Sequence, residues 1–383
     1  MKVFSLSMLM IGAIIGAGFA SGREIVSFFG TEISPWIALV VGVGIFAVSL
    51  VLLSIGIKVK KDSFGEVNQQ ILGRFSPFAD VFLLLNGFIV LSGMLAGMDS
   101  LFHPIFSFAP AYSVVSGIVC VFIVTKGVQG IINGSGIIVP LIIIALIAVC
   151  AFNFSTSYMT KTAQDLPAAV VYVSMNMMLA STVFTTVNKY SYKQIVGASA
   201  LTGGVIAVLM LLIISALNKT QTYPYPMPVV EIAKNTSPAL YVFSIIAVAI
   251  GIFTTMMTAM SGLTEFFVPF VGSRAYSAVF VLLLALMVSN LGFETVIAYL
   301  YPIIGVVGLF YIAICFVYLT RNRYRKLSKT ANSFFDNRHH DIHKSGKQTK
   351  NQWDQAKISS LMIGLYQTRS ISTLYTNGLN IPN

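Results

Sequence analysis

The stretch Gly16-Ala17-Gly18-Phe19-Ala20-Ser21-Gly22 places three glycines within seven residues, in the middle of the first long apolar segment. That segment runs from about residue 3 to residue 29, long enough to cross a bilayer as a helix. Glycine favours backbone that leaves helical geometry or that another group approaches closely. In hydrocarbon, unpaired backbone groups are tolerated only where they face protein or a water-filled cavity. The stretch therefore predicts an interrupted first helix whose seven residues line a substrate site inside the membrane.

The composition is that of a membrane protein. The 383 residues are 56% hydrophobic and only 10% charged, and the mean hydropathy is +0.83. The net charge of +11 does not indicate nucleic-acid binding, because 11 of the 24 Lys and Arg residues follow Thr320 and most of the others fall in short loops. The three cysteines lie in apolar segments without paired spacing, so neither a disulfide framework nor a zinc site is expected.

Apolar runs of sufficient length predict ten transmembrane helices, and the expected fold class is an all-α polytopic membrane protein. The runs are roughly 3–29, 36–57, 78–102, 111–125, 134–153, 167–188, 195–217, 239–268, 275–291 and 295–319. Basic loop residues are concentrated on the side that carries Lys2. The positive-inside rule then places both termini in the cytoplasm, as an even number of spans requires, and the expected location is the cell membrane.

The ten spans divide into two sets of five. We expect a first repeat over residues 1–153, an external polar link over 154–166 and a second repeat over 167–319. Because each repeat has an odd number of spans, the second must be inverted relative to the first. Residues 320–383 are polar and basic, and they predict a disordered cytoplasmic tail.

Span six carries a polar centre at Ser174 and Asn176, at the position that matches the glycine-rich stretch. This predicts a second interruption with Ser174 and Asn176 as substrate-binding residues. The alternative is a helix with ordinary polar packing residues.

An interrupted helix releases carbonyls at the end of its first half and N–H groups at the start of its second half. Carbonyls suit a cation and N–H groups suit a carboxylate, so a zwitterionic amino acid, or an organic anion transported with a cation, matches the pair. Arg23 and Glu24 follow directly, and ionised residues at membrane depth indicate function. They predict an outer gate, with a salt bridge that only seats the first span as the alternative.

The run from Ile14 to Glu24, closed by Phe28 and Phe29, resembles the first helix of the bacterial YkvI-like membrane proteins. These are members of the amino acid–polyamine–organocation transporter superfamily. The resemblance covers residues 1 to about 320, and it implies the LeuT-like fold, a 5+5 inverted repeat in which helices 1 and 6 are broken. The run Gly16-x-Gly18-Phe19 is similar to the glycine motif with which that superfamily holds a substrate carboxylate.

The same resemblance bears on a cation. In related sodium-independent carriers a lysine on span five stands in for sodium, and this chain has no lysine between Gly134 and Asn153. Members with a sodium site use hydroxyls on span eight, here Thr254 and Thr255, and carbonyls before the break, here Gly12 and Ile15. Such oxygens suit a hard cation. Na⁺ is thus the candidate metal and no other cofactor is expected; the alternative is that each hydroxyl bonds a carbonyl of its own helix.

These features predict a secondary active transporter of an amino acid or a similar small zwitterionic or anionic solute. It would work by alternating access with Na⁺ or H⁺ coupling, and Glu265 is the candidate for proton coupling. An enzyme is not expected, because the spans hold no paired acids, Ser–His set or His cluster. The sequence also has no phosphate-binding loop, so transport driven by the chain's own ATP hydrolysis is not expected. The alternative is a transporter-derived sensor that signals through its tail. The expected partners are a small-molecule substrate and the bilayer, without nucleic acid.

Overall fold

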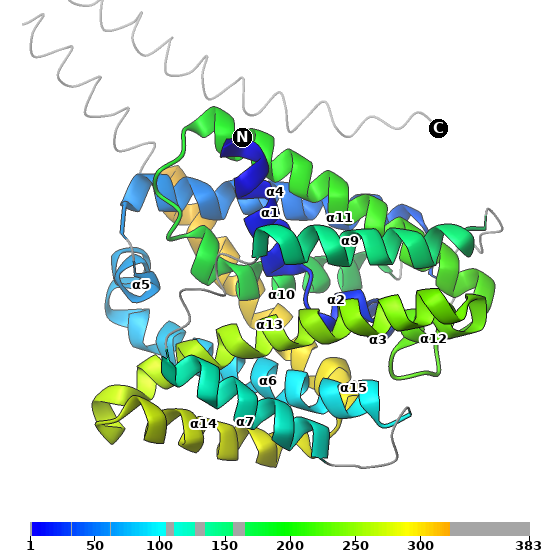
Figure 1. The fold of residues 1–383 in the computed structure, drawn as a ribbon. Helices are drawn as coiled ribbons and strands as arrows, with labels where there is room; N and C mark the ends of the chain where they lie inside the picture. Colours follow the sequence, from blue (N-terminus) through cyan, green and yellow to red (C-terminus); the bar gives the residue numbers. More distant parts are fainter. Residues whose placement is uncertain are drawn as a thin grey trace, which may run out of the picture. The chain divides into compact units, whose positions relative to one another are not determined.

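The computed structural model describes residues 2–31, 33–61, 63–104, 111–126, 135–155 and 165–321, and these residues are helical without any strand (Figure 1). The chain divides into two units, Met1–Leu319 and Thr320–Asn383. The predicted tail from residue 322 onward lies outside the described residues, as does most of the predicted link 154–166.

The first half of the described chain begins with three helices in place of one. Its elements are α1 (Lys2–Ile14), α2 (Ala17–Ala20), α3 (Arg23–Phe29), α4 (Trp36–Val59), α5 (Phe64–Leu72), the 3-10 turn η1 (Gly73–Phe75), α6 (Ser76–Phe102), α7 (Ala111–Lys126) and α9 (Ser135–Phe152).

The second half begins with a single long helix. Its elements are α10 (Asp165–Phe184), α11 (Tyr192–Thr220), α12 (Pro228–Thr236), α13 (Pro238–Val271), α14 (Arg274–Ser289), α15 (Phe293–Thr295) and the π-helical η2 (Val296–Leu300). The last two are the start of one apolar helix, Phe293–Arg321, which we call the last helix. Local sequence sets several of these bounds: Ser191 and Gln194 form a reciprocal capping box at α11, and prolines begin α12 and α13.

Within the described residues, six helices are long and apolar enough to cross a membrane. They are Trp36–Val59, Phe64–Phe102, Leu166–Phe184, Tyr192–Thr220, Pro238–Val271 and Phe293–Arg321. Four shorter apolar helices accompany them, namely Lys2–Ile14, Tyr112–Lys126, Ile138–Phe152 and Arg274–Ser289. Large apolar side chains such as Leu39, Phe122 and Leu283 are exposed, which suits a surface against lipid. The exact count of ten spans stays a prediction.

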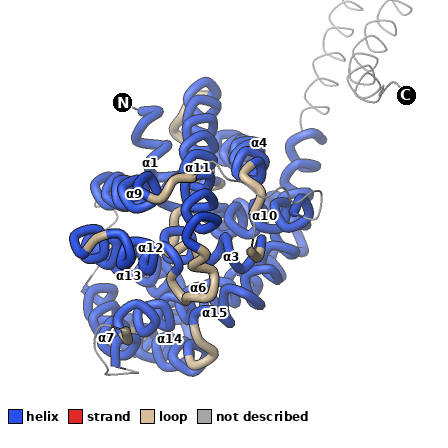
Figure 2. The backbone as a smooth tube through the Cα atoms, turned by 90° about the vertical axis from the view of Figure 1, so that its right-hand side faces the viewer, coloured by secondary structure: helices blue, strands red, loops and turns tan. Residues whose placement is uncertain are grey.

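Helices that hold the same place in the two halves pack on one another. Contacts join α1 to α10, α4 to α11, α6 to α13 and α7 to α14. Each half also places a nine-residue helix, α5 or α12, before its longest helix, and a 16-residue helix after it. Figures 1 and 2 show α7 and α14 together on the side of the molecule away from α4 and α11.

The starts of the two halves differ. The chain is non-helical at Ile15 and Gly16, between α1 and α2, whereas α10 runs without interruption through Ser174 and Asn176. The predicted interruption of span six at this polar centre is therefore wrong. The physical reason is that the polar side chains are satisfied by packing: Ser174 Oγ donates to the Gly305 carbonyl at 2.7 Å, and Asn176 Nδ2 donates to the carbonyl one turn earlier at 3.0 Å.

Candidate functional site

The break, which we define as residues 15–22, leaves backbone carbonyls without helical partners. The Gly16 N–H donates to the Ile14 carbonyl at 2.9 Å, so the regular bond to the Gly12 carbonyl is not made. Within the described part of the chain, no backbone N–H reaches the carbonyl of Gly12 or of Ile15. Two acceptors are therefore available to a ligand at the end of α1.

Backbone donors are available on the other side of the same turn. Among the described residues, the N–H groups of Ala17, Gly18 and Phe19 form no hydrogen bond outside α2, which is too short to satisfy them. The α2 residues and Ser21 are buried. Free donors and free acceptors thus lie within a few residues of each other inside the protein, where neither can be satisfied by bulk water.

Two glycines of the break are required by their surroundings. A Cβ at Gly18 would overlap the carboxyl group of Glu24, so only glycine allows that side chain to lie across α2. Gly22 has φ +78°, and a Cβ there would lie 2.9 Å from Val229 Cγ2 of α12. The Val229 N–H also donates to the Ser21 carbonyl at 2.9 Å, so α12 covers the Gly22 end of the break.

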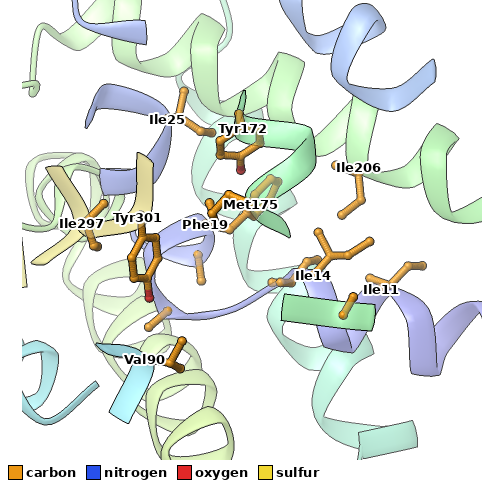
Figure 3. Packing of buried hydrophobic residues seen from close by; sticks show 14 of the residues in the cluster. Ile11, Ile14, Phe19, Ile25, Val90, Tyr172, Met175, Ile206, Ile297 and Tyr301 are labelled. Atoms are coloured by element: carbon orange, nitrogen blue, oxygen red, sulfur yellow. The ribbon is translucent and has the colours of Figure 1, made fainter. Parts of the chain in front are cut away.

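Glu24 is the one buried charged side chain among the described residues, with 4% of its surface exposed. Its Oε2 atom has no hydrogen-bond partner within the described residues. The hydroxyl of Tyr172 on α10 lies close enough to interact with the carboxyl group. The hydroxyl of Tyr301 on the last helix also lies within electrostatic range of the Glu24 carboxyl group. Figure 3 shows Tyr172 and Tyr301 with Phe19 of α2 in the same buried region.

Aromatic contacts hold α3 against α10 at this point. The rings of Phe28 and Phe29 pack on Tyr172, with ring centroids 5.2 and 5.6 Å apart. This fixes the position of the Tyr172 ring and therefore the wall opposite Glu24.

Arg23 has different partners from Glu24. Its Nη1 atom lies 3.4 Å from Glu294 Oε1 of the last helix and donates to the carbonyls of Tyr223 and Tyr225 at 3.2 Å each. The Arg23 side chain is 14% exposed and that of Glu294 is 43% exposed. The two residues predicted together as a gate thus have different surroundings: Arg23 bridges three segments at the rim, and Glu24 lies inside.

One of the two hydroxyls predicted to bind sodium, that of Thr255, lies near the break. A Cβ on Gly16 would stand 4.0 Å from Thr255 Oγ1, which places Thr255 at the break. Thr254 lines an apolar pocket with Ile138 of α9, and the next residue, Val139, fills the space at Gly12. Thr254 therefore lies against α6 and α9, beside Met98 and Ile138.

The hydroxyls of Thr254 and Thr255 both donate to carbonyls of their own helix at 3.0 Å. This is the alternative that the sequence analysis gave to a sodium site. Each hydroxyl hydrogen therefore points toward its own helix, and the lone pairs of the hydroxyl oxygen stay available as acceptors. The oxygens therefore remain suited to a cation, and the residues present fit a sodium ion chemically.

Other predicted residues lie elsewhere. Ser174 faces Gly305 and Gly308 of the last helix rather than the break. Glu265, the predicted proton-coupling residue, is 56% exposed and forms an ion pair with Arg274. Sequence reasoning missed Tyr172, Tyr301 and the partner role of Glu294, because their importance depends on which helices pack together.

No family model matches the chain. Two proteins of Bacillus subtilis (strain 168), the uncharacterized membrane protein YkvI and the uncharacterized protein YyaD, are each 26% identical to it over 325 and 324 residues. The alignments cover 80% of this chain and 93% and 94% of those proteins. The chain is thus a homologue of uncharacterized membrane proteins, which confirms the resemblance of the first helix and supports a multi-pass membrane protein.

Solved structures reveal the fold. Mhp1 in its inward-facing conformation matches with a TM-score of 0.56 at 14% identity, covering 80% of this chain and 73% of Mhp1. MhsT in complex with L-phenylalanine matches with a TM-score of 0.55 at 18% identity, and the match covers 77% of this chain and 80% of MhsT. A Na⁺-coupled sialic acid symporter matches with a TM-score of 0.54 at 14% identity, and the match covers 75% of this chain and 71% of the symporter. The fold is that of the LeuT-like transporters. These neighbours are not enzymes, and they do not favour the alternative of a sensor.

Proposed function

We propose that this chain is a secondary active transporter of the cell membrane, with both termini in the cytoplasm. It moves an amino acid or a similar small zwitterionic or anionic solute by alternating access. The observation that carries the proposal is the buried break, which offers free carbonyls and free N–H groups within one LeuT-like bundle. Its structural neighbours include MhsT in complex with L-phenylalanine and a Na⁺-coupled sialic acid symporter, which supports a small-molecule substrate without identifying it.

The architecture proposed is ten spans in two inverted five-helix repeats, residues 1–153 and 167–319. The packing of α1, α4, α6 and α7 on their counterparts α10, α11, α13 and α14 supports this division. A bundle of this kind holds its substrate between the repeats, and α1 and α10 meet there.

The substrate would lie against the break. Its carboxylate would take the free N–H groups of Ala17 and Gly18, and the rings of Phe19, Tyr172 and Tyr301 would form the surrounding wall. Such a pocket combines a few convergent polar groups with apolar walls, as small-molecule sites do. Ser174 and Asn176 stay predictions as substrate-binding residues, since the structure uses their donor groups in packing.

The outer gate would be the contact of Arg23 with Glu294 and with the segment before α12. This contact joins the first span to the last helix across the rim of the break. A gate must break in each cycle, and a partly exposed ion pair is weak enough to do so.

Sodium would bind between α1 and α13, held by the carbonyls of Gly12 and Ile15 and by the hydroxyls of Thr254 and Thr255. A bound cation would satisfy two carbonyls that the break leaves free. It would also couple solute binding to a sodium gradient.

A ligand screen tests the function. The purified full-length chain is heated with each of the common amino acids, in sodium chloride and in choline chloride. A substrate at about 100 times its Kd should stabilise the native state by about 2.7 kcal/mol, and by less in choline. Uptake of that ligand into proteoliposomes then separates a transporter from a binding protein.

Thr255→Val tests the sodium site against a matched control. The variant should abolish the difference between sodium and choline, because it removes the hydroxyl nearest the break. Thr258→Val removes an exposed hydroxyl one turn further along α13, a hydroxyl that donates to the Thr254 backbone carbonyl. This variant should retain the difference between sodium and choline. Equal ligand effects in sodium and choline for the parent would disprove sodium coupling. A ligand that binds but is never taken up would disprove transport.

A further inference from the structure

We propose that Glu24 is a proton-binding site that links closure of the break to protonation, which makes the proton a coupling ion. The first part concerns the chain alone. The second part, coupling to transport, rests on the proposed function.

Little around Glu24 balances a negative charge, because its polar neighbours are the neutral hydroxyls of Tyr172 and Tyr301. The side chain is 4% exposed and its Oε2 atom has no hydrogen-bond partner. A buried carboxylate without a counter-charge is strongly unfavourable, whereas a buried neutral carboxyl group is far less so. Taking up a proton is therefore the simplest way for the closed site to exist.

The helices packed against α3 supply no cation. Contacts join α3 to α2, α10 and the last helix. α2 has no titratable side chain; α10 presents Tyr172, and the last helix presents Tyr301. On α3 itself Arg23 is engaged at the rim with Glu294. No ion pair within the described residues includes Glu24.

The position of Glu24 joins its protonation to the movement of the break. Its carboxyl group occupies the space that Gly18 leaves by lacking a Cβ, so it lies directly on α2. Any movement that opens the Gly22 end of the break, where α12 and Arg23 cover it, would admit water to this carboxyl group. Water stabilises the charged form, so the open state releases the proton and the closed state binds it.

Other carboxylates do not share these properties. Glu265 is exposed and paired with Arg274, and Glu294 is paired with Arg23. An ionised form of either has both solvent and a counter-charge. Among the described carboxyl groups Glu24 is the buried one, and it is the one to which we assign the proton.

Infrared spectroscopy of the purified full-length chain tests the first part without any substrate. At neutral pH the parent should show the carbonyl stretch of a buried protonated carboxyl group. Glu24→Gln should lose that band and Glu24→Asp should shift it, whereas Glu294→Gln should leave it unchanged. A parent that shows only ionised carboxylate bands, or a band that survives in both Glu24 variants, would overturn the assignment.

Cysteine labelling tests the link to closure. Ala20→Cys, in a background with Cys120, Cys150 and Cys315 replaced by alanine, places a reporter in the buried break. The intrinsic pH dependence of thiol labelling is the same in Glu24→Gln, so the ratio of parent to Glu24→Gln rates isolates the effect of Glu24. That ratio should rise between about pH 6 and about pH 9, by at most about tenfold per pH unit for one proton. A constant ratio would overturn the link.

The outcomes separate this inference from the proposed function. If the chain takes up a ligand but a proton gradient never changes the uptake, the coupling step is wrong and the transporter stands. If the chain transports nothing, the proposed function is wrong, while the infrared and labelling results still decide whether Glu24 binds a proton.

Discussion

The segment α1–α3 and the helix α10 begin the two halves of the bundle and pack on each other, yet one is interrupted and the other is continuous. The difference shows that polar composition does not by itself interrupt a transmembrane helix. Hydroxyl and amide side chains in α10 bond to carbonyls nearby and keep the helix intact. In α1–α3 the glycines have no side chain, and the space they leave is occupied by Glu24 and Val229.

Because of this difference, the two sides of the candidate site contribute different kinds of polar group. The break contributes backbone groups, whereas α10 contributes the side chain of Tyr172. If both segments had been broken, each would have released carbonyls and N–H groups. Because only the first segment is broken, α10 releases no backbone groups. The polar groups beside the break come instead from the side chains of Glu24, Tyr172 and Tyr301.

The largest effect is expected from Gly18→Leu. The new side chain must displace Glu24 from α2, so ligand-induced thermal stabilisation should be lost, and overpacking should lower the free energy of unfolding by about 1–3 kcal/mol. Gly204→Leu on α11 is the control, because a Cβ there meets no atom within 4 Å. Unaltered ligand binding by Gly18→Leu would place the site outside the break.

Gly22→Ala should have the next largest effect. The left-handed backbone at φ +78° costs about 1–2 kcal/mol for a residue with a Cβ, and the contact with Val229 adds to it. Gly272→Ala is a matched control, because Gly272 has φ +77° and a Cβ there would meet no atom within 4 Å. Its loss of stability therefore measures the cost of the left-handed backbone alone. Thermal unfolding of both variants measures the difference. Equal losses of stability would show that α12 does not press on the break.

The sequence predicts the break well because glycine has a local physical meaning. The positions of Gly16 and Gly18 predict non-helical or closely approached backbone, and the structure ends α1 at Ile14 and begins α2 at Ala17. Hydrophobic length likewise predicts most of the helices to within a few residues. These features depend on neighbouring residues, which a single sequence contains.

The sequence predicts α10 and the surroundings of Glu24 poorly because both depend on distant partners. Whether Ser174 interrupts a helix depends on the Gly305 carbonyl, 131 residues away, which accepts its hydrogen bond. Arg23 and Glu24 are adjacent in sequence, but the rotation of α3 sends one to the rim and the other inward. A hydropathy pattern gives depth in the membrane and does not give the direction a side chain faces.

A smaller effect is expected for the polar centre of α10. Ser174→Ala and Asn176→Ala should each lower stability by about 1 kcal/mol, since each loses one hydrogen bond. The ligand-induced thermal shift should persist if α10 serves as a wall. If either variant loses the shift while its stability is unchanged, that residue binds substrate and the two segments contribute more equally.

The smallest effect on stability is expected at the rim, where Arg23 and Glu294 are 3.4 Å apart. The pair is partly exposed, so Glu294→Gln should change the free energy of unfolding by no more than about 1 kcal/mol. Glu231→Gln is the matched control, because the Lys234–Glu231 pair has the same 3.4 Å separation but lies within α12 alone.

Accessibility distinguishes the two rim pairs where stability does not. With the cysteine reporter at position 20, Glu294→Gln should raise the labelling rate several-fold, because it loosens the contact that joins the break to the last helix. Glu231→Gln breaks no contact with the break and should leave the rate unchanged. Equal rates in the two variants would mean that the Arg23 contact only seats α3 against the last helix, and the outer closure would then depend on α12 and its bond from Val229 to Ser21.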